Sequence, residues 1–200
     1  MNIATNPDLA VRALQEGEFA VLLDHPEREG EADLLLAAQF ATGEKVNEMV
    51  NVGRGLITLA VAAERLAQLG IPLIQPANCG PNWPHLAEPI DYRLGTTTGA
   101  SAFDRAATAK AVADPASRPQ DFARPGHLLP ISAAAGGLRE RSGHTEGAIA
   151  LALAADLFPA VLMCEMMDSE GHMARGVQLK ELLRRAGLPV VTVEELAERR

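Results

Sequence analysis

The sequence predicts a layered α/β or α+β domain with a largely buried β-sheet. Helical and strand-like segments alternate from one end of the 200-residue chain to the other, as in domains where helices cover a sheet. Hydrophobic residues make up 48% of the chain, and a folded domain of this length buries roughly 70% of the surface of its unfolded chain. The chain can therefore form a core without disulfides or a structural metal.

Each predicted element of the first half has a local signal. Asn6 and Pro7 are typical of the cap and first position of a helix that ends near Gly17, and Thr42 is a typical cap for a second helix. Gly70 ends a third. The predicted helices of this half are 7–16, 42–52 and 64–69, and the predicted strands are 19–23, 34–38, 55–61 and 72–74.

Two segments in the middle of the chain are rich in proline and predict irregular connections. They are 76–89, which holds four prolines and the only tryptophan, and 115–130. Ser101 caps a predicted helix that runs to Val112, and a strongly apolar helix, buried on most of its surface, starts at Gly143. The remaining predictions are a strand at 160–166, a helix at 177–185 ended by Gly187, a strand at 188–193 and a charged terminal turn.

The charge balance excludes a protein whose main partner is nucleic acid. The 18 basic residues face 26 acidic ones, which leaves a formal net charge of -8, whereas binding to a phosphate backbone needs clustered lysine and arginine. Only five Phe, one Tyr and one Trp are present. Interfaces built on stacked bases or aromatic anchors are therefore also disfavoured.

The cysteine content and the N-terminal sequence indicate the cellular compartment of the protein. Cys79 and Cys164 are the only cysteines and lie far apart in the sequence, so a disulfide framework or a cysteine zinc site is not expected. The chain does not begin with the pattern of a signal peptide and has no apolar run of eighteen residues. We expect a cytoplasmic protein with no membrane partner.

The segment 28–33, Arg-Glu-Gly-Glu-Ala-Asp, is the first candidate for chemistry. If it is extended, the carboxylates of Glu29, Glu31 and Asp33 share one face, because side chains alternate along a strand. Such a face is costly without a cation, and Mg²⁺ with its preference for oxygen ligands would stabilise it. The alternative, which composition alone favours, is a solvated acidic turn.

The segment 141–146, Arg-Ser-Gly-His-Thr-Glu, opens the apolar helix. Arg141 and the free amides near Thr145 could hold a phosphate, since a helix N-terminus attracts anions. His144 could bind a metal or transfer protons. The alternative is an ordinary cap in which Ser142 or Thr145 accepts backbone hydrogen bonds and His144 lies on the surface.

Two further residues could carry chemistry. Glu165 lies between Cys164 and Met166 at the end of a hydrophobic strand, where burial would raise its pKa toward values useful in proton transfer. An outward-pointing Glu165 is equally compatible with strand alternation. His127 follows Arg-Pro-Gly in a polar loop, and no role is expected for His25, His85 or His172.

Taken together, these segments resemble the 3,4-dihydroxy-2-butanone 4-phosphate synthase family. The resemblance follows the chain in order and covers nearly its whole length: DHPEREGEAD at 24–33, GRGLITLAV at 53–61, TTTGASAFDR at 96–105, RPGHLLP at 124–130, RSGHTE at 141–146 and CEMMDSEGHMAR at 164–175. The acidic segment and the GHTE motif are its specific parts, and EREGEAD and CEMM are closer to the archaeal style of the family. The resemblance implies a single three-layer domain over 1–200 with a mixed sheet flanked by helices.

The resemblance also implies an activity, the Mg²⁺-dependent conversion of D-ribulose 5-phosphate to L-3,4-dihydroxybutan-2-one 4-phosphate and formate in riboflavin biosynthesis. Two Mg²⁺ ions are implied, with Mn²⁺ as a substitute, in a homodimer whose active sites lie close to the subunit interface. The implied metal ligands are Glu29 and His144. The implied substrate-binding residues are Arg28, Glu29, Asp33, Arg141, Ser142, Gly143, His144, Thr145 and Glu165, and the implied catalytic residues are Asp33, His127 and Glu165.

The sequence departs from the family pattern at three places. Thr58 stands where the family usually has a cysteine, His25 and Pro26 stand where acidic residues are common, and HLAEPIDYR replaces a strand rich in Phe, Thr and Val. Pro89 within that segment is unfavourable for an internal strand. With 200 residues, the chain is not expected to include the GTP cyclohydrolase domain that some family members carry.

These departures leave two alternatives to the implied activity. The first is a divergent paralogue that acts on a related sugar phosphate and gives another product. The second is a non-catalytic sugar-phosphate binder or nucleotide-binding module on a related fold. A binder would have no need to keep Glu29, His144 and Glu165 together.

Overall fold

The computed structural model describes residues 3–25, 28–78 and 83–199, and the predictions for Pro26, for Cys79 and for 79–82 of the first proline-rich loop lie outside these ranges. The described chain forms a mixed sheet in the order β4-β6-β3-β7-β2-β1-β8, with β5 also paired to β6. The pairs β3–β6 and β1–β8 are parallel and the others are antiparallel. The strands are β1 Ala20–Leu23, β2 Ala32–Ala37, β3 Thr58–Val61, β4 His85–Leu86, β5 Ile90–Tyr92, β6 Phe122–Ser132, β7 Ala160–Glu165 and β8 Val190–Thr192.

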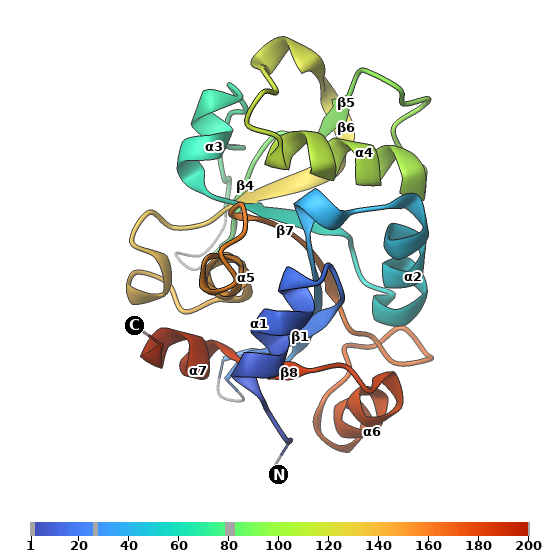
Figure 1. Cartoon of the computed structure of the whole chain (residues 1–200), viewed down its shortest axis with the longest axis vertical. Helices are drawn as coiled ribbons and strands as arrows, with labels where there is room; N and C mark the ends of the chain where they lie inside the picture. Colours follow the sequence, from blue (N-terminus) through green and yellow to red (C-terminus); the bar gives the residue numbers. More distant parts are fainter. Residues whose placement is uncertain (1–2, 26–27, 79–82, 200) are drawn as a thin grey trace.

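Helices cover both faces of this sheet, as the cartoon in Figure 1 shows. They are α1 Pro7–Gln15, α2 Gly43–Gly53, α3 Ala63–Gln68, α4 Ala102–Ala113, α5 His144–Ala154, α6 Gly176–Ala186 and α7 Val193–Glu198. Buried residues of α1, α5 and α7 form one hydrophobic cluster with one face of the strands. Buried residues of α2, α3, α4 and α6 form a second cluster with the other face.

The side chains of β2 point alternately into two apolar clusters, which explains why the strands of this sheet are continuous apolar runs in the sequence. Leu34 and Leu36 belong to one cluster and Leu35 belongs to the other, and all three are fully buried. Successive side chains point to opposite faces, so a sheet with helices on both sides needs apolar residues at every position. The predicted layered domain with a largely buried sheet is confirmed.

Several predicted helix ends are confirmed by their hydrogen bonds. The side chains of Asn6, Thr42 and Ser101 each accept a bond from a backbone N–H three residues later, at the starts of α1, α2 and α4. Gly187 ends α6 in the left-handed conformation, with φ 62°. Each signal is local, which is why the sequence alone reveals it.

The second proline-rich connection is a correction, because much of it is the longest strand of the sheet. β6 runs over Phe122–Ser132 and contains Pro125 and Pro130. The pairing with β5 shifts register between Ile90 and Asp91, and their partners on β6 are Leu128 and Ala123. Pro125 therefore lies in a bulge, one of the few places where a strand tolerates proline.

Two shorter predictions also change. The segment 72–74 forms a single bridge from Leu73 to Ala87 instead of a strand. The charged terminal turn is the helix α7, whose start is stabilised by a capping box between Thr192 and Glu195. Pro89 lies between β4 and β5, in keeping with the expectation that proline does not occur inside an internal strand.

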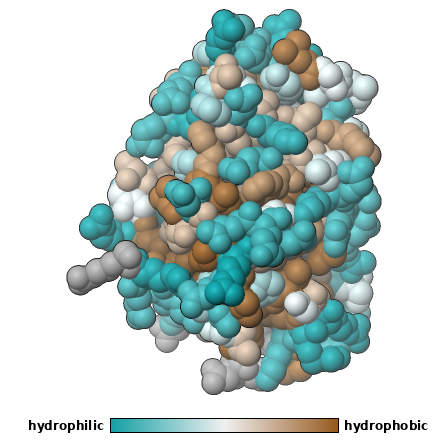
Figure 2. Space-filling view, in the orientation of Figure 1, coloured by the Kyte–Doolittle hydropathy of each residue, from teal (hydrophilic) through white to brown (hydrophobic). Residues whose placement is uncertain are grey.

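The outer surface is mixed in polarity. Figure 2 shows a mainly hydrophilic face, on which hydrophobic residues appear between polar ones around the middle. No helix in the described part of the chain is long and apolar enough to cross a membrane.

Candidate active site

A cavity of about 170 Å³ brings together residues from segments far apart in the sequence. The turn before β2, the strands β2, β3, β6 and β7, and the start of α5 all contribute to its wall. The lining residues are Arg28, Glu29, Glu31, Asp33, Thr58, Pro84, Ile131, Arg141, His144, Thr145, Met163 and Glu165. Most of the residues singled out in the sequence therefore surround one space.

The acidic segment reaches this cavity by a turn, so the predicted extended conformation is wrong for its first half. Arg28 and Glu29 lie in a turn, and Gly30 has φ +65°, in the left-handed region that favours glycine. The strand begins only at Ala32. The carboxylates of Glu29, Glu31 and Asp33 nevertheless all line the cavity: Glu29 reaches it from the turn, and Asp33 lies on β2.

Asp33 is a buried carboxyl group next to other acids. It lies on β2 directly opposite Glu165 on β7, and 6% of its surface is exposed. The pKa of Asp33 is raised to about 6, chiefly by burial; nearby His144 lowers it, and the charges of Glu165, Glu29 and Glu31 raise it. The group can thus gain and lose a proton close to neutral pH.

Glu165 is held at the end of β7 by the backbone before β3. Its Oε2 atom accepts a hydrogen bond of 2.8 Å from the backbone N–H of Leu56. A Cβ atom at Gly55 would lie 2.4 Å from the same oxygen, so only glycine lets the two segments approach this closely. The side chain faces the cavity and not the solvent side that strand alternation left open.

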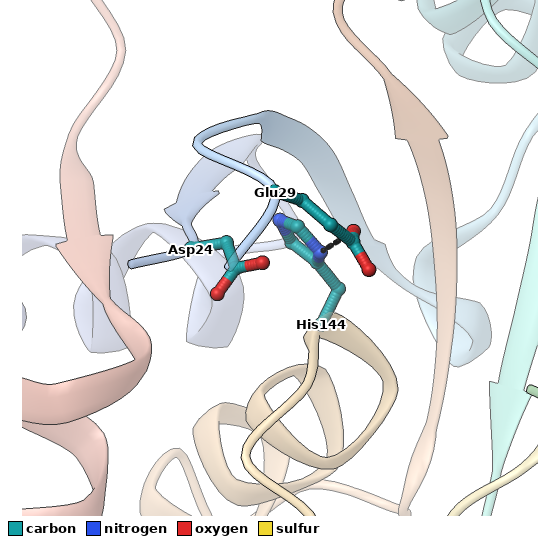
Figure 3. A group of neighbouring side chains, drawn as sticks. All are labelled: Asp24, Glu29 and His144. Atoms are coloured by element: carbon teal, nitrogen blue, oxygen red, sulfur yellow. Dashed lines mark ion pairs between the residues drawn. The ribbon is translucent and has the colours of Figure 1, made fainter. Parts of the chain in front are cut away.

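His144 begins α5 and is buried among carboxylates (Figure 3), so the alternative of a surface histidine is wrong. Its Nδ1 atom lies 3.7 Å from Oε2 of Glu29, and its buried Nε2 atom has no hydrogen-bond partner among the described residues. Burial lowers the pKa of His144, but the charges of Asp33, Glu29 and Asp24 outweigh it and raise the pKa to about 9. Contact with His144 in turn lowers the pKa of Glu29.

Asp24 belongs to the same group, although no sequence pattern singled it out. Asp24, Glu29 and His144 offer ligand atoms that lie within 4.8 Å of one another. Only 1% of the Asp24 side chain is exposed, and it pairs with Arg28 at 2.6 Å. Its position directly after the β1 strand and before the acidic turn is the signal that could have identified it.

The donor set of this cluster suits a hard divalent cation. It combines carboxylate oxygens with an imidazole nitrogen, and Mg²⁺ is commonly held by one or two carboxylates. The buried Nε2 atom of His144 lacks a partner in the described part of the chain, which is costly for a polar group without a ligand. The residues therefore fit a metal ion.

The start of α5 also lines the cavity. Arg141 and Thr145 both contribute to its wall, while Ser142 is exposed and Gly143 is buried. Gly143 is the cap residue of α5, and no side chain caps the helix there, so the ordinary cap by Ser142 or Thr145 is not formed. The first amides of the helix are thus available to an anion.

Two further residues from the sequence comparison have clear positions, one outside the cavity and one on its wall. His127 is not among the residues that line the cavity. It lies on β6 with a half-exposed side chain, and its Nδ1 atom is 2.7 Å from Oδ2 of Asp91 on β5. Thr58, at the position where the family usually has cysteine, is buried and lines the cavity.

Comparisons with known proteins give consistent results. The family model described as 3,4-dihydroxy-2-butanone 4-phosphate synthase matches residues 8–199. The chain is 41% identical over 196 residues to the 3,4-dihydroxy-2-butanone 4-phosphate synthase of Agrobacterium fabrum (strain C58 / ATCC 33970), covering 98% of this chain and 92% of that protein. It is also 41% identical over 193 residues to riboflavin biosynthesis protein RibBA of Aquifex aeolicus (strain VF5), covering 96% of this chain and 48% of that protein. The chain thus spans about half the length of this second relative.

A solved structure is also similar over nearly the whole chain. The crystal structure of a 3,4-dihydroxy-2-butanone 4-phosphate synthase in complex with two magnesium ions superposes with a TM-score of 0.88 at 37% identity, covering 97% of this chain and 95% of that one. At this level of identity the likeness extends from the fold to the family.

Proposed function

The chain belongs to the 3,4-dihydroxy-2-butanone 4-phosphate synthase family, and we propose that it is a lyase of riboflavin biosynthesis. The proposed reaction converts D-ribulose 5-phosphate to L-3,4-dihydroxybutan-2-one 4-phosphate and formate with Mg²⁺. One observation carries the proposal: a small cavity collects four carboxylates, a buried histidine and two arginines from distant segments. We also propose that the chain 1–200 forms one domain of this family.

Charge complementarity supports the assignment of the substrate groups. Arg28 and Asp33 are proposed to bind the sugar hydroxyls, and Arg141 with Ser142, Gly143 and Thr145 is proposed to bind the phosphate. Arginine recognises phosphate well because its planar fork can donate two parallel hydrogen bonds. The uncapped start of α5 adds amide donors at the same place.

The proposed metal ligands are Glu29 and His144, with Asp24 as a third donor within reach. When bound there, Mg²⁺ would act as a Lewis acid that makes the C–H next to the substrate ketone more acidic. We also propose that the site holds two ions and that Mn²⁺ can replace Mg²⁺. Arg28 would stay oriented by Asp24, whose other oxygen accepts a bond from the backbone of His25.

Proton transfer is assigned to Asp33 and Glu165, which face each other across β2 and β7. With a pKa of about 6, Asp33 can accept a proton at one point of the reaction and return it at another. Glu165 is also a proposed ligand for the substrate. Its hydrogen bond to the backbone of Leu56 keeps one oxygen oriented while the carboxyl group faces the cavity.

His127 is the third proposed catalytic residue, and its position supports a homodimer. It is half-exposed and lies away from the lining of the cavity in its own chain. We propose that His127 reaches the cavity of a second copy. The cytoplasmic location stays a prediction from the sequence.

Formate release tests the proposed function directly. Purified protein with D-ribulose 5-phosphate and Mg²⁺ should release one formate for each substrate consumed, and EDTA should stop the release. A folded protein that releases no formate under these conditions would refute the proposal. If the substrate disappears without formate, mass spectrometry of the product would identify a divergent paralogue; if calorimetry shows binding without consumption, the protein is a binder.

A further inference from the structure

Glu146, in the first turn of α5, is a buried carboxylate that none of the proposed roles uses. Only 2% of its surface is exposed. Its Oε1 atom accepts a hydrogen bond of 3.0 Å from the backbone N–H of Ala134, and its Oε2 atom accepts one of 2.7 Å from Nη1 of Arg141. Both oxygens are therefore engaged, each by a different segment of the chain.

The pair with Arg141 differs from an ordinary surface salt bridge. The Glu146 side chain is 1% exposed and that of Arg141 is 22% exposed, so the carboxylate is shielded from water, while Arg141 lines the cavity. Removing one partner of such a pair leaves a buried charge without compensation. The cost of leaving the Glu146 carboxylate unpaired therefore favours the one orientation of Arg141 in which the two side chains are paired.

Gly143 supplies independent evidence that the pair is tightly placed. A Cβ atom at this position would lie 2.4 Å from Nη1 of Arg141 and 3.0 Å from Oε2 of Glu146. The backbone of Gly143 has φ -119°, which any residue can adopt. What position 143 requires is space for the Arg141–Glu146 pair and not an unusual backbone conformation.

We infer that Glu146 is a positioning residue, which holds Arg141 so that the remaining N–H groups of its guanidinium face the phosphate of the substrate. The inference rests on the proposed function for the identity of the anion. Ala134 ties Glu146 to the chain after β6, so the carboxylate is itself fixed before any ligand arrives. A preorganised arginine costs less to order when the phosphate binds.

The variant Glu146→Gln tests this role with almost no change in volume. A glutamine side chain has one acceptor oxygen and one NH₂ group, so it cannot accept from both Ala134 and Arg141. If its oxygen stays with Ala134, its NH₂ group faces the guanidinium and Arg141 loses its anchor. We expect KM for ribulose 5-phosphate to rise about tenfold while kcat changes less than about threefold, because a contact to a non-reacting group is weakened.

Gly143→Ala tests the same inference without altering a charge. The added methyl group would displace the guanidinium, and KM should rise by a similar factor. Glu140→Gln is the matched control. Glu140 is an exposed carboxylate next to Arg141 in sequence that accepts from the backbone of Gly136, and its variant should leave KM and kcat unchanged.

Two readouts separate positioning from a merely structural role. In the Arg141→Ala background, Glu146→Gln should raise KM no further, since residues that act through one another are not additive. The Mg²⁺ concentration for half-maximal activity should also stay the same. A further rise in KM in the double variant, or an unchanged KM in both Glu146→Gln and Gly143→Ala, would overturn the inference.

Calorimetry with inorganic phosphate keeps the test separate from the proposed activity. The unchanged protein should bind phosphate about tenfold more tightly than Glu146→Gln or Gly143→Ala, the factor expected for a weakened charge-assisted contact. Absence of formate release together with this difference would refute the lyase and support the role of Glu146. Formate release with equal phosphate affinity in all three proteins would support the lyase and refute the role of Glu146.

Discussion

At the scale of single residues, the candidate site concentrates groups whose charges oppose stability. Asp33 is buried beside Glu165, Glu29 and Glu31, and only His144 among its main neighbours favours its ionised form. A buried carboxylate that is not fully paired is costly. Such strain is typical of functional sites, where the charge is later stabilised by a ligand.

Replacing Asp33 by Asn should remove this cost along with the activity. The unfolded carboxyl group has a pKa near 3.8 and the folded one a pKa of about 6, so the folded state loses stability relative to the unfolded state as the pH rises from about 4 to about 6, and the full loss remains at higher pH. Asp33→Asn should therefore be more stable than the unchanged protein at pH 8 in EDTA, by at most about 3 kcal/mol. Below about pH 4 the two proteins should be equally stable.

Thermal unfolding across this pH range measures the effect, with Glu170→Gln as the control because its side chain is 80% exposed. A constant difference between Asp33→Asn and the unchanged protein from pH 4 to pH 8 would contradict the assigned cause. Formate release by Asp33→Asn at a normal rate would contradict its proposed catalytic role.

Glu29→Ala and His144→Ala test the proposed metal ligands. Each should abolish formate release and weaken Mg²⁺ binding measured by calorimetry, because each removes a donor from the cluster with Asp24. Glu29 is half-exposed, so its variant should lose less than about 1 kcal/mol of stability. Glu170→Ala again serves as the acidic control, and near-normal turnover of either ligand variant would refute the assignment.

At the scale of elements, two glycines decide how closely neighbouring segments meet. Gly55 lets the turn before β3 approach Glu165, and Gly126 lets β6 approach the backbone of β5. The second contact sets the place of His127, whose backbone and ring both bond to Asp91. The close approach of these segments depends on the lack of a side chain at Gly55 and Gly126 as well as on the side chains that are in contact.

Gly126→Ala should separate β5 from β6. Its Cβ atom would lie 2.1 Å from the backbone carbon of Ile90, and a backbone atom cannot move aside as a side chain can. We expect a loss of about 3 kcal/mol in the free energy of unfolding, comparable to other severe core clashes. Denaturant unfolding measures it.

Ala123→Ser is the control on the same strand, since it adds one atom at an exposed position. It should change the free energy of unfolding by less than about 0.5 kcal/mol. A Gly126→Ala protein as stable as this control would show that β5 can shift without cost.

At the scale of the whole molecule, the sheet separates two apolar clusters and the cavity opens at the ends of its central strands. β2 and β7 carry Asp33 and Glu165 to the same level, and the segment that leads into α5 brings Arg141 and His144 to the same cavity. His127 lies elsewhere on the chain. A homodimer with shared sites is the arrangement that would complete the proposed catalytic set.

Mixing two inactive variants tests that arrangement. If His127 serves the partner's cavity, His127→Ala and Glu29→Ala should each be inactive alone. After subunit exchange, half of the dimers combine one copy of each variant, and one of their two sites is intact, so about a quarter of the full activity should return. Sedimentation should show a dimer, and no recovery from fully exchanged dimers would mean that His127 does not act across the interface.

Local signals in the sequence were enough for much of the fold. Helix caps at Asn6, Thr42 and Ser101, the stop at Gly187 and the apolar runs of the central strands are all confirmed by the structure. Each depends on residues within one turn or on the alternation of a single strand. The motifs also selected most of the residues that line the cavity, although their chemical roles stay predictions.

The strands and contacts that the sequence did not reveal all depend on distant partners. Pro125 and Pro130 argue locally against a strand, yet β6 forms because β3, β4 and β5 pair with it. Asp24 joins Glu29 and His144 in the candidate metal cluster only because the turn at Gly30 and the start of α5 meet beside it. The sequence by itself determined the family, the layered fold and the chemistry available, since these depend on residue type and local spacing. Only the tertiary structure decided which groups are buried together, how their pKa values shift and that His127 lies apart, because these depend on distances across the folded chain.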